Sequence, residues 1–406
     1  MKTYFLLLIF SLLSTFQLSA AVNNEFRFRH FTVEDGLSSN GVRGIVQDKQ
    51  GYIWFGTDNG LNRYDGKDIK EYRIDNLGIN ENIYTLYATD NMLWIGTEKG
   101  LYTFNFETEK IEFFNIHTSD NNNIHSSVQH IIEDKQNHIW FSTYGQGVFR
   151  YNQKEQHLVQ YKFSESNGMI ASVFIDNENQ IWAISNIGKN SPYKLNKVKD
   201  TFEPTAFKYS KPNYNSAALV MFEDSHHELW LGSWESGLQK IDKYTGEAKV
   251  YLHPADGKKG TMHIHNIIEY SPGQLLVGSD DGLLHFNTLT EEYHLYQKDD
   301  SNSYSLSNNF VYPIIKDHEG GIWIGTYYGG VNYISSHASL FESYTPSIHH
   351  NSISGSVIGR FCEGPDGKIW IASDDGGLSC FDPLNKHFNH YLPNDRKNSL
   401  SYHNVH

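Results

Sequence analysis

A strand-like frame recurs eight times along this chain. In its first copy a polar turn at Asp48–Gly51 precedes the apolar run Tyr52–Thr57, and Asn59-Gly60 supplies the φ > 0 residues that a hairpin needs. The anchors in the second strand of each copy are Trp54, Trp94, Trp140, Trp182, Trp230, Leu276, Trp323 and Trp370. They lie 40–48 residues apart. Repeats of this period with four strand-like segments predict a β-propeller, in which each sheet packs between two neighbours.

Composition agrees with an all-β body and excludes one class of partner. Aromatic residues are 14% of the chain and there are only 10 prolines in 406 residues, which suits strands and argues against disorder. The net charge is −14, and no basic stripe offsets it. We therefore expect no nucleic acid to contact this region.

The start of the chain offers a strand that the seventh unit lacks. After Gly329–Ile334 the next segment, Leu340–Thr345, resembles Phe26–Thr32 more than an internal fourth strand. We expect Phe26–Thr32 to pair with the third strand of unit seven, because closing the ring removes exposed sheet edges. The expected domains are a seven-bladed propeller at residues 22–336 and the truncated first blade of a second propeller at 337–406. An eight-bladed ring that includes Trp370 is the alternative.

Residues 1–21 read as a secretory signal peptide. Lys2 precedes the apolar run Tyr4–Phe16, and Ser19–Ala21 supplies small residues for cleavage. An uncleaved N-terminal anchor is the alternative, although the apolar run is short for a membrane span. No later stretch approaches 18 apolar residues. We therefore expect an exported, periplasmic chain that attaches to a membrane only through segments outside this sequence.

The two cysteines do not form a disulfide framework. Cys362 and Cys380 fall on the first and third strands of the last unit, with one strand between them. Because neighbouring strands lie about 4.8 Å apart, the two sulfurs would be too distant for a bridge. Two free, buried thiols are expected.

No pattern in the chain predicts catalysis or metal binding. A Gly-rich phosphate loop, a Cys-x-x-Cys and a His-Glu-x-x-His are all missing from the sequence. The aspartates before the repeated tryptophans are spread around the ring, so we interpret them as turn formers: Asp48, Asp134, Asp176, Asp224 and Asp317. His263 and His265 would share one strand face, but no third ligand stands at an expected spacing. We therefore expect no catalytic residues, no metal ligands and no cofactor.

Recognition is better supported than catalysis. Turns between second and third strands share one end of a propeller, and several of them carry aromatic residues, which can stack on sugar rings. The innermost strands add further side chains at the channel mouth, among them Gln129 and Tyr312. The predicted ligand-binding residues are Arg43, Tyr84, Tyr144, Trp234, Glu235, His265, Tyr327 and Tyr328. The alternative is that these aromatics pack on neighbouring loops or on a partner domain.

The repeats resemble the two-component-regulator propeller repeats of hybrid sensor histidine kinases from gut-type Bacteroidetes. Phe31–Ile45 is similar to the opening segment of that family, and Asp48–Tyr64 is similar to its repeat. The resemblance covers about Phe26–Asn404 and implies an export signal followed by two seven-bladed propellers. It further implies a small β-domain, a membrane helix, and kinase, receiver and DNA-binding domains beyond this chain. The implied periplasmic propellers respond to oligosaccharides from polysaccharides.

The leading hypothesis is therefore the sensor region of a hybrid two-component regulator. It would bind an oligosaccharide from polysaccharide breakdown and signal to a kinase outside this chain. The chain itself would not be an enzyme, and a homodimer would form through C-terminal parts beyond it. One alternative is a stand-alone periplasmic binding or scaffold propeller. The other is a propeller polysaccharide lyase or hydrolase.

Overall fold

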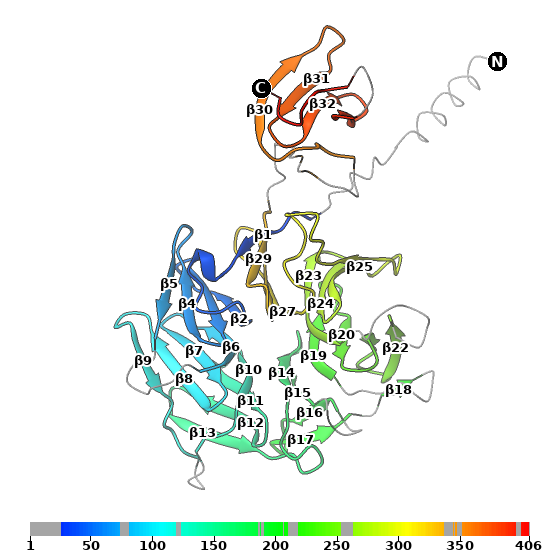
Figure 1. Ribbon diagram of the computed structural model, residues 1–406. Helices are drawn as coiled ribbons and strands as arrows, with labels where there is room; N and C mark the ends of the chain where they lie inside the picture. The colour runs from blue at the N-terminus through cyan, green and yellow to red at the C-terminus, as the bar shows by residue number, and fades with distance from the viewer. Residues whose placement is uncertain are drawn as a thin grey trace, which may run out of the picture.

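The computed structural model is an all-β protein built from eight small sheets (Figure 1). It describes residues 26–405 except 74–80, 119–122, 186, 188–190, 206, 210–217, 253–262, 337–343, 345, 347–350 and 395–398. In that part the one helical element is the 3-10 turn η1 (Val33–Asp35). No helix in it is long and apolar enough to span a membrane. The propeller class predicted from the repeats is confirmed.

The sheets are numbered here in chain order. Sheet one contains β2 (Val42–Gln47), β3 (Ile53–Thr57), β4 (Gly60–Tyr64) and β5 (Ile69–Tyr72). Sheet two contains β6 (Ile83–Ala88), β7 (Met92–Thr97), β8 (Gly100–Asn105) and β9 (Lys110–Phe113). Sheet three contains β10 (Val128–Glu133), β11 (His138–Thr143), β12 (Gly147–Asn152) and β13 (His157–Tyr161). Sheet four contains β14 (Ser172–Ile175), β15 (Ile181–Ile184), β16 (Tyr193–Asn196) and β17 (Thr201–Pro204).

The remaining sheets follow the same antiparallel plan with two variations, a parallel extra strand in sheet five and a borrowed strand in sheet seven. Sheet five contains β18 (Lys208–Tyr209), β19 (Ala218–Glu223), β20 (Leu229–Ser233), β21 (Leu238–Ile241) and β22 (Glu247–Tyr251). Sheet six contains β23 (Ile264–Ser271), β24 (Gln274–Ser279), β25 (Gly282–Asn287) and β26 (Tyr293–Tyr296). Sheet seven contains β27 (Val311–Lys316), β28 (Ile322–Thr326), β29 (Val331–Ile334) and β1 (Arg29–Phe31). Sheet eight contains β30 (Ile358–Glu363), β31 (Ile369–Ser373), β32 (Gly377–Asp382) and β33 (His387–Tyr391).

The N-terminal strand joins the two ends of the ring. β1 pairs antiparallel with β29, with Arg29 opposite Tyr333 and Phe31 opposite Val331. The paired stretch is shorter than the predicted Phe26–Thr32. The first strands of sheets one to seven contact one another in a closed cycle, in which β27 of sheet seven returns to β2 of sheet one. Residues 1–25 and 337–343 lie outside the described part, so the signal peptide and the boundary at 336/337 stay predictions.

Each repeated aspartate joins its turn to the tryptophan six residues later. Oδ1 of Asp134 accepts the backbone N–H of His138 at 3.0 Å, which confirms the predicted role in the turn. Oδ2 of Asp134 also accepts Nε1–H of the buried Trp140 at 2.7 Å. The same indole bond recurs at 2.7–3.0 Å in four more sheets, from Trp54, Trp182, Trp230 and Trp323. This link between turn and core was not predicted from the sequence.

Sheets approach closely where the second strand carries glycine. A Cβ added to Gly232 in β20 would lie 2.4 Å from Cγ2 of Ile264, in the first strand of the next sheet. Real Cβ atoms do not come that close, so a side chain here would push the two sheets apart. The tryptophan two residues earlier, Trp230, is only 1% exposed between the same sheets. Small and large residues thus alternate along the second strand to fit the taper of the ring.

Sheet eight lies outside the ring (Figure 1), and two predictions were wrong there. The six ring tryptophans are at most 5% exposed, as predicted, but Trp370 is only half-buried. Cys380 is a buried free thiol as predicted, whereas Cys362 is exposed. Both exceptions follow from the first strand of sheet eight, where Phe361 is 67% exposed. In the ring, a neighbouring sheet covers the equivalent position, Ile45, which is 6% exposed.

Candidate functional site

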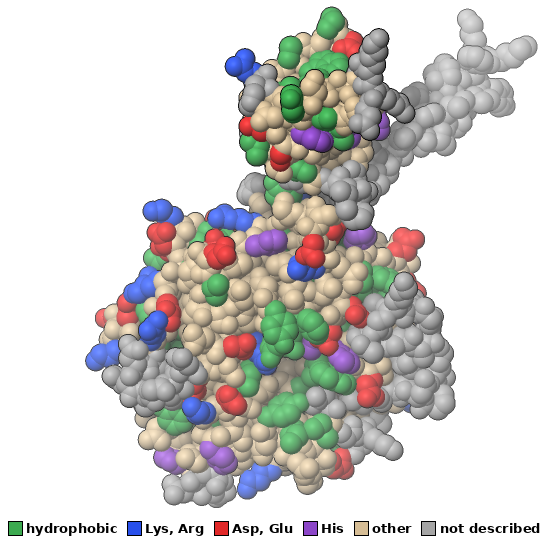
Figure 2. All heavy atoms as spheres, in the orientation of Figure 1, with side chains coloured by type: hydrophobic (Ala, Val, Ile, Leu, Met, Phe, Trp, Pro, Cys, Tyr) green, Lys and Arg blue, Asp and Glu red, His purple; other side chains and the backbone are tan. Residues whose placement is uncertain are grey.

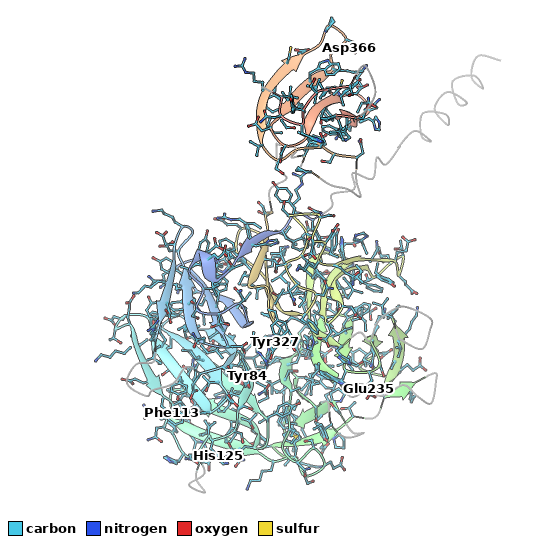
Figure 3. The ribbon with its side chains drawn as sticks, viewed as in Figure 1. Tyr84, Phe113, His125, Glu235, Tyr327 and Asp366 are labelled. Atoms are coloured by element: carbon cyan, nitrogen blue, oxygen red, sulfur yellow. The ribbon has the colours of Figure 1, made fainter. Side chains whose placement is uncertain are left out.

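One end of the ring gathers aromatic and charged side chains. We call it the aromatic end, and define it by Arg43, Asp58, Tyr84, Trp234, His263, His265, Asp280, Tyr312, Tyr327 and Tyr328. These residues stand near the start of the first strands or in the turns after the second strands. Figure 3 shows Tyr84 and Tyr327 beside the centre of the ring and Glu235 farther out. In Figure 2 hydrophobic, acidic, basic and histidine side chains gather over the middle of the ring.

Three tyrosine rings surround the guanidinium of Arg43. Its Cζ lies 4.7 Å from the ring centre of Tyr327, 5.1 Å from that of Tyr84 and 5.6 Å from that of Tyr312. The rings come from sheets seven and two, on either side of β2. Such cation–π contacts stabilise a positive charge that is partly removed from water. The ring closure therefore creates this group, because β2 and β27 are neighbours only when the circle is complete.

Asp58 pairs with Arg43 from the hairpin turn of the same sheet. Oδ1 of Asp58 lies 3.4 Å from Nε of Arg43, and both atoms are buried without an aligned hydrogen bond. Burial raises the pKa of Asp58, and the positive charge of Arg43 opposes that shift only in part. Burial likewise raises the pKa of Tyr84 and of Tyr312. The tyrosines therefore stay neutral and present rings and hydroxyl groups.

Two histidines share the carboxylate of Asp280. His265 lies in β23, and His263 is the residue before that strand. Nδ1 of His263 and Nε2 of His265 each lie 2.6 Å from an oxygen of Asp280, and each imidazole donates a hydrogen bond to it. Burial disfavours the charge of Asp280, but the hydrogen bonds and charges of His265 and His263 outweigh it, and its pKa lies below the ordinary value. In the described part of the chain, no three or more His, Cys, Asp or Glu residues are grouped so that they could hold a metal ion.

These histidines also connect the aromatic rings of neighbouring sheets. Trp234 stacks on His263 with ring centres 4.1 Å apart and an interplanar angle of 8°. Tyr312 stacks on His265 at 4.2 Å and 13°. Asp280 therefore orients two stacked pairs that reach from sheet five to sheet seven. The sequence pointed to His265 but missed Asp280 and Asp58, because both occupy hairpin turns where a carboxylate looks like a turn former.

The predicted residues divide into an inner and an outer group. Tyr327 is half-buried against Arg43, while Tyr328 is 64% exposed and packs edge to face on Tyr327, with ring centres 4.4 Å apart. Trp234 is 41% exposed, with one face covered by His263. Trp234 and Tyr328 therefore offer open ring surface at the rim, and the half-buried rings hold the interior.

Two predicted residues lie apart from the Arg43 group. Tyr144 forms an isolated bridge with Met169, and its backbone N–H bonds to Ser127, so its described contacts belong to sheets three and four. Glu235 is exposed and follows Trp234 in the chain. All eight predicted residues remain a prediction as ligand contacts.

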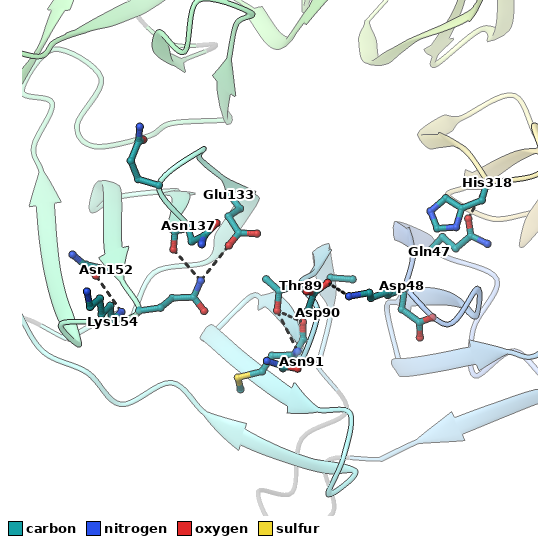
Figure 4. Close-up of a pocket in the computed structure, with 15 residues that line it drawn as sticks. Gln47, Asp48, Thr89, Asp90, Asn91, Glu133, Asn137, Asn152, Lys154 and His318 are labelled. Carbon is teal, nitrogen blue, oxygen red and sulfur yellow. Dashed lines mark hydrogen bonds and ion pairs between the residues drawn. The ribbon is translucent and has the colours of Figure 1, made fainter.

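The opposite end of the ring is different in character. A cavity of about 770 Å³ lies where β2, β6 and β10 finish (Figure 4). Its lining includes Gln47, Asp90, Glu133, Lys154 and His318, and it contains no aromatic ring except that of the histidine. A polar hollow of this kind suits water and ions better than the flat faces of sugar rings. We therefore take the aromatic end as the candidate recognition site.

A closed cycle of seven small sheets defines a β-propeller. Residues 36–59, 122–145 and 305–328 match the family described as Two component regulator propeller. The chain therefore carries two-component regulator propeller repeats, which confirms the resemblance drawn from the sequence.

Similar proteins agree with this fold. Histidine kinase P4 of Formosa agariphila is 28% identical over 330 residues, which are 77% of this chain and 23% of that protein. The extracellular domain of BT3049 from B. thetaiotaomicron, designated a hybrid two component system, superposes with a TM-score of 0.70 at 23% identity, covering 90% of this chain and 49% of that one. Virginiamycin B lyase from Staphylococcus aureus gives 0.60 at 15% identity, covering 77% and 99%. The chain thus spans less than a quarter of its curated relative, and these structural likenesses show the fold alone.

Proposed function

We propose that this chain is the exported recognition region of a hybrid two-component sensor, and that it binds an oligosaccharide at the aromatic end. The observation that supports this most is the open ring surface of Trp234 and Tyr328 at the rim of a polar mouth. Sugar rings stack on such surfaces while carboxylates and amides bond their hydroxyl groups. The repeats and the similarity to Histidine kinase P4 support the sensor class.

Isothermal titration calorimetry with a panel of oligosaccharides tests the binding site. Trp234→Ala and Tyr328→Ala should each weaken binding about tenfold or more, since exposed aromatic anchors often dominate such sites. Tyr244→Ala is the matched control, because Tyr244 is 80% exposed on a turn between β21 and β22. If a glycan binds and both site variants keep wild-type affinity, the rim aromatics serve packing with a partner domain.

Export and signalling are tested separately. The mass of the protein recovered from the periplasm should correspond to cleavage after residue 21. Retention of residues 1–21 in the recovered protein contradicts the signal peptide. A reporter driven by the regulator should respond to the bound glycan in cells that make the whole protein, and a propeller with no kinase should give no response.

An enzyme remains the competing function, because Asp280 orients two histidines as a carboxylate orients a general base. A lyase or hydrolase should release product when incubated with the polysaccharide whose fragments bind. We expect no product over hours at micromolar protein. Product that disappears in His265→Asn would overturn the binding-only function.

A further inference from the structure

The guanidinium of Arg43 is held by its sides and left open at its tip. The three tyrosine rings lie around its Cζ, and Oδ1 of Asp58 lies 3.4 Å from Nε. Within the described part of the chain, Nη1 and Nη2 make no hydrogen bond, and neither is among the fully buried polar atoms. The Arg43 side chain is 24% exposed. The two terminal nitrogens of the guanidinium thus have no hydrogen-bond acceptor in the described part of the chain, on a side chain that solvent reaches.

A fork held in this way matches an anion with two oxygens. Carboxylates and sulfates accept two parallel N–H bonds from the tip of a guanidinium, and neutral hydroxyl groups do so less well. We propose that the aromatic end selects acidic saccharides, with the carboxylate or sulfate of one sugar on Nη1 and Nη2 of Arg43 and adjoining sugar rings on Trp234 or Tyr328. This rests on the proposed oligosaccharide function and names the class of sugar.

The nearby carboxylates are placed so that they do not block an anion there. Asp58 lies on the Nε side of the guanidinium, so an anion at the tip is closer to the positive charge than to that carboxylate. Asp280 directs its oxygens to His263 and His265 rather than to Arg43. Asp58 is therefore a positioning residue, which keeps the fork turned toward the mouth, and Arg43 determines specificity.

The test compares matched acidic and neutral sugars by calorimetry. The probes are oligogalacturonates and chondroitin sulfate oligosaccharides, with carboxyl-reduced and desulfated forms as their neutral partners. Arg43→Gln removes the fork, Arg43→Lys keeps the charge without the fork, and Lys298→Gln is the control. Lys298 follows β26 at the same end of the ring and pairs only with the exposed Asp300 in the described part. Thermal unfolding of each variant shows whether it is folded.

We expect the wild-type protein to bind an acidic probe about tenfold or more tightly than the neutral partner of that probe, because only the acidic probe accepts charge-assisted hydrogen bonds from Arg43. Arg43→Gln should lose that preference, Arg43→Lys should keep only part of it, and Lys298→Gln should keep it all. Which acidic probe binds separates carboxylate from sulfate. Tight binding of neutral sugars alone overturns the acidic class but leaves the proposed function intact. Binding of no sugar overturns both.

Discussion

The loss of stability on replacing a buried tryptophan by phenylalanine should depend strongly on which sheet carries the tryptophan. Trp140 donates its indole N–H to Asp134 at 2.7 Å, while Nε1 of Trp94 is buried and has no acceptor in the described part of the chain. Position 88, six residues before Trp94, is alanine rather than aspartate. Both tryptophans are 2% exposed, so Trp140→Phe and Trp94→Phe remove similar amounts of buried ring.

The two substitutions therefore differ mainly by one hydrogen bond to a carboxylate. Such a bond contributes about 1.5–3 kcal/mol, and removing an unsatisfied buried N–H at Trp94 should regain about 1 kcal/mol or more. We expect Trp140→Phe to lower the free energy of unfolding by at least about 2 kcal/mol more than Trp94→Phe. The remaining cavity terms largely cancel, because both rings lie between sheets of the same ring.

Urea unfolding followed by far-UV circular dichroism measures the difference without depending on tryptophan fluorescence. A double-mutant cycle with Asp134→Ala and Trp140→Phe should return a coupling of about 1.5–3 kcal/mol. Losses at Trp140 and Trp94 that agree within about 0.5 kcal/mol, with a coupling near zero, would show that the indole bond adds nothing to stability.

Three further measurements test the packing and the buried titratable groups. Gly232→Ala should lower the free energy of unfolding by about 1–3 kcal/mol, because the added Cβ meets the next sheet. The control Gly359→Ala, whose Cβ would have only ordinary contacts, should change that free energy little. Equal effects of the two substitutions contradict the close approach. Burial lowers the pKa of His130 from 6.5 to about 4. As pH falls, the unfolded chain therefore takes up the proton before the folded chain does. The free energy of unfolding should drop between pH 6.5 and about 4, by about 2 kcal/mol at about pH 5. A His130→Gln variant whose stability depends on pH as steeply as that of the wild type refutes this. Cys362 should react with a thiol reagent in the native protein and Cys380 only after unfolding, so equal native rates would be contrary evidence.

The repeat was enough to predict the fold, because the residues that form each sheet lie close together in the sequence. Asp134 and Trp140 stand six residues apart, within one hairpin, so their periodic recurrence indicates the sheet and its buried anchor. The pairing of the N-terminal strand could also be predicted, since the seventh unit lacks a fourth strand and β1 supplies it. The exposure of Cys362 and the partial exposure of Trp370 could not be read in this way. Their burial depends on a neighbouring sheet, and a repeat pattern does not say whether that sheet is present.

The sequence by itself determined the sheets, their order and the aromatic character of one end, because strand periodicity and turn chemistry are local. The tertiary structure alone decided which of those side chains meet. Arg43 and Tyr312 are far apart in sequence and become neighbours through ring closure. Asp280 acquires two histidines only when the start of β23 lies against the β24–β25 turn. The group that surrounds Arg43 is therefore a property of the closed circle, since no single repeat contains all of its members.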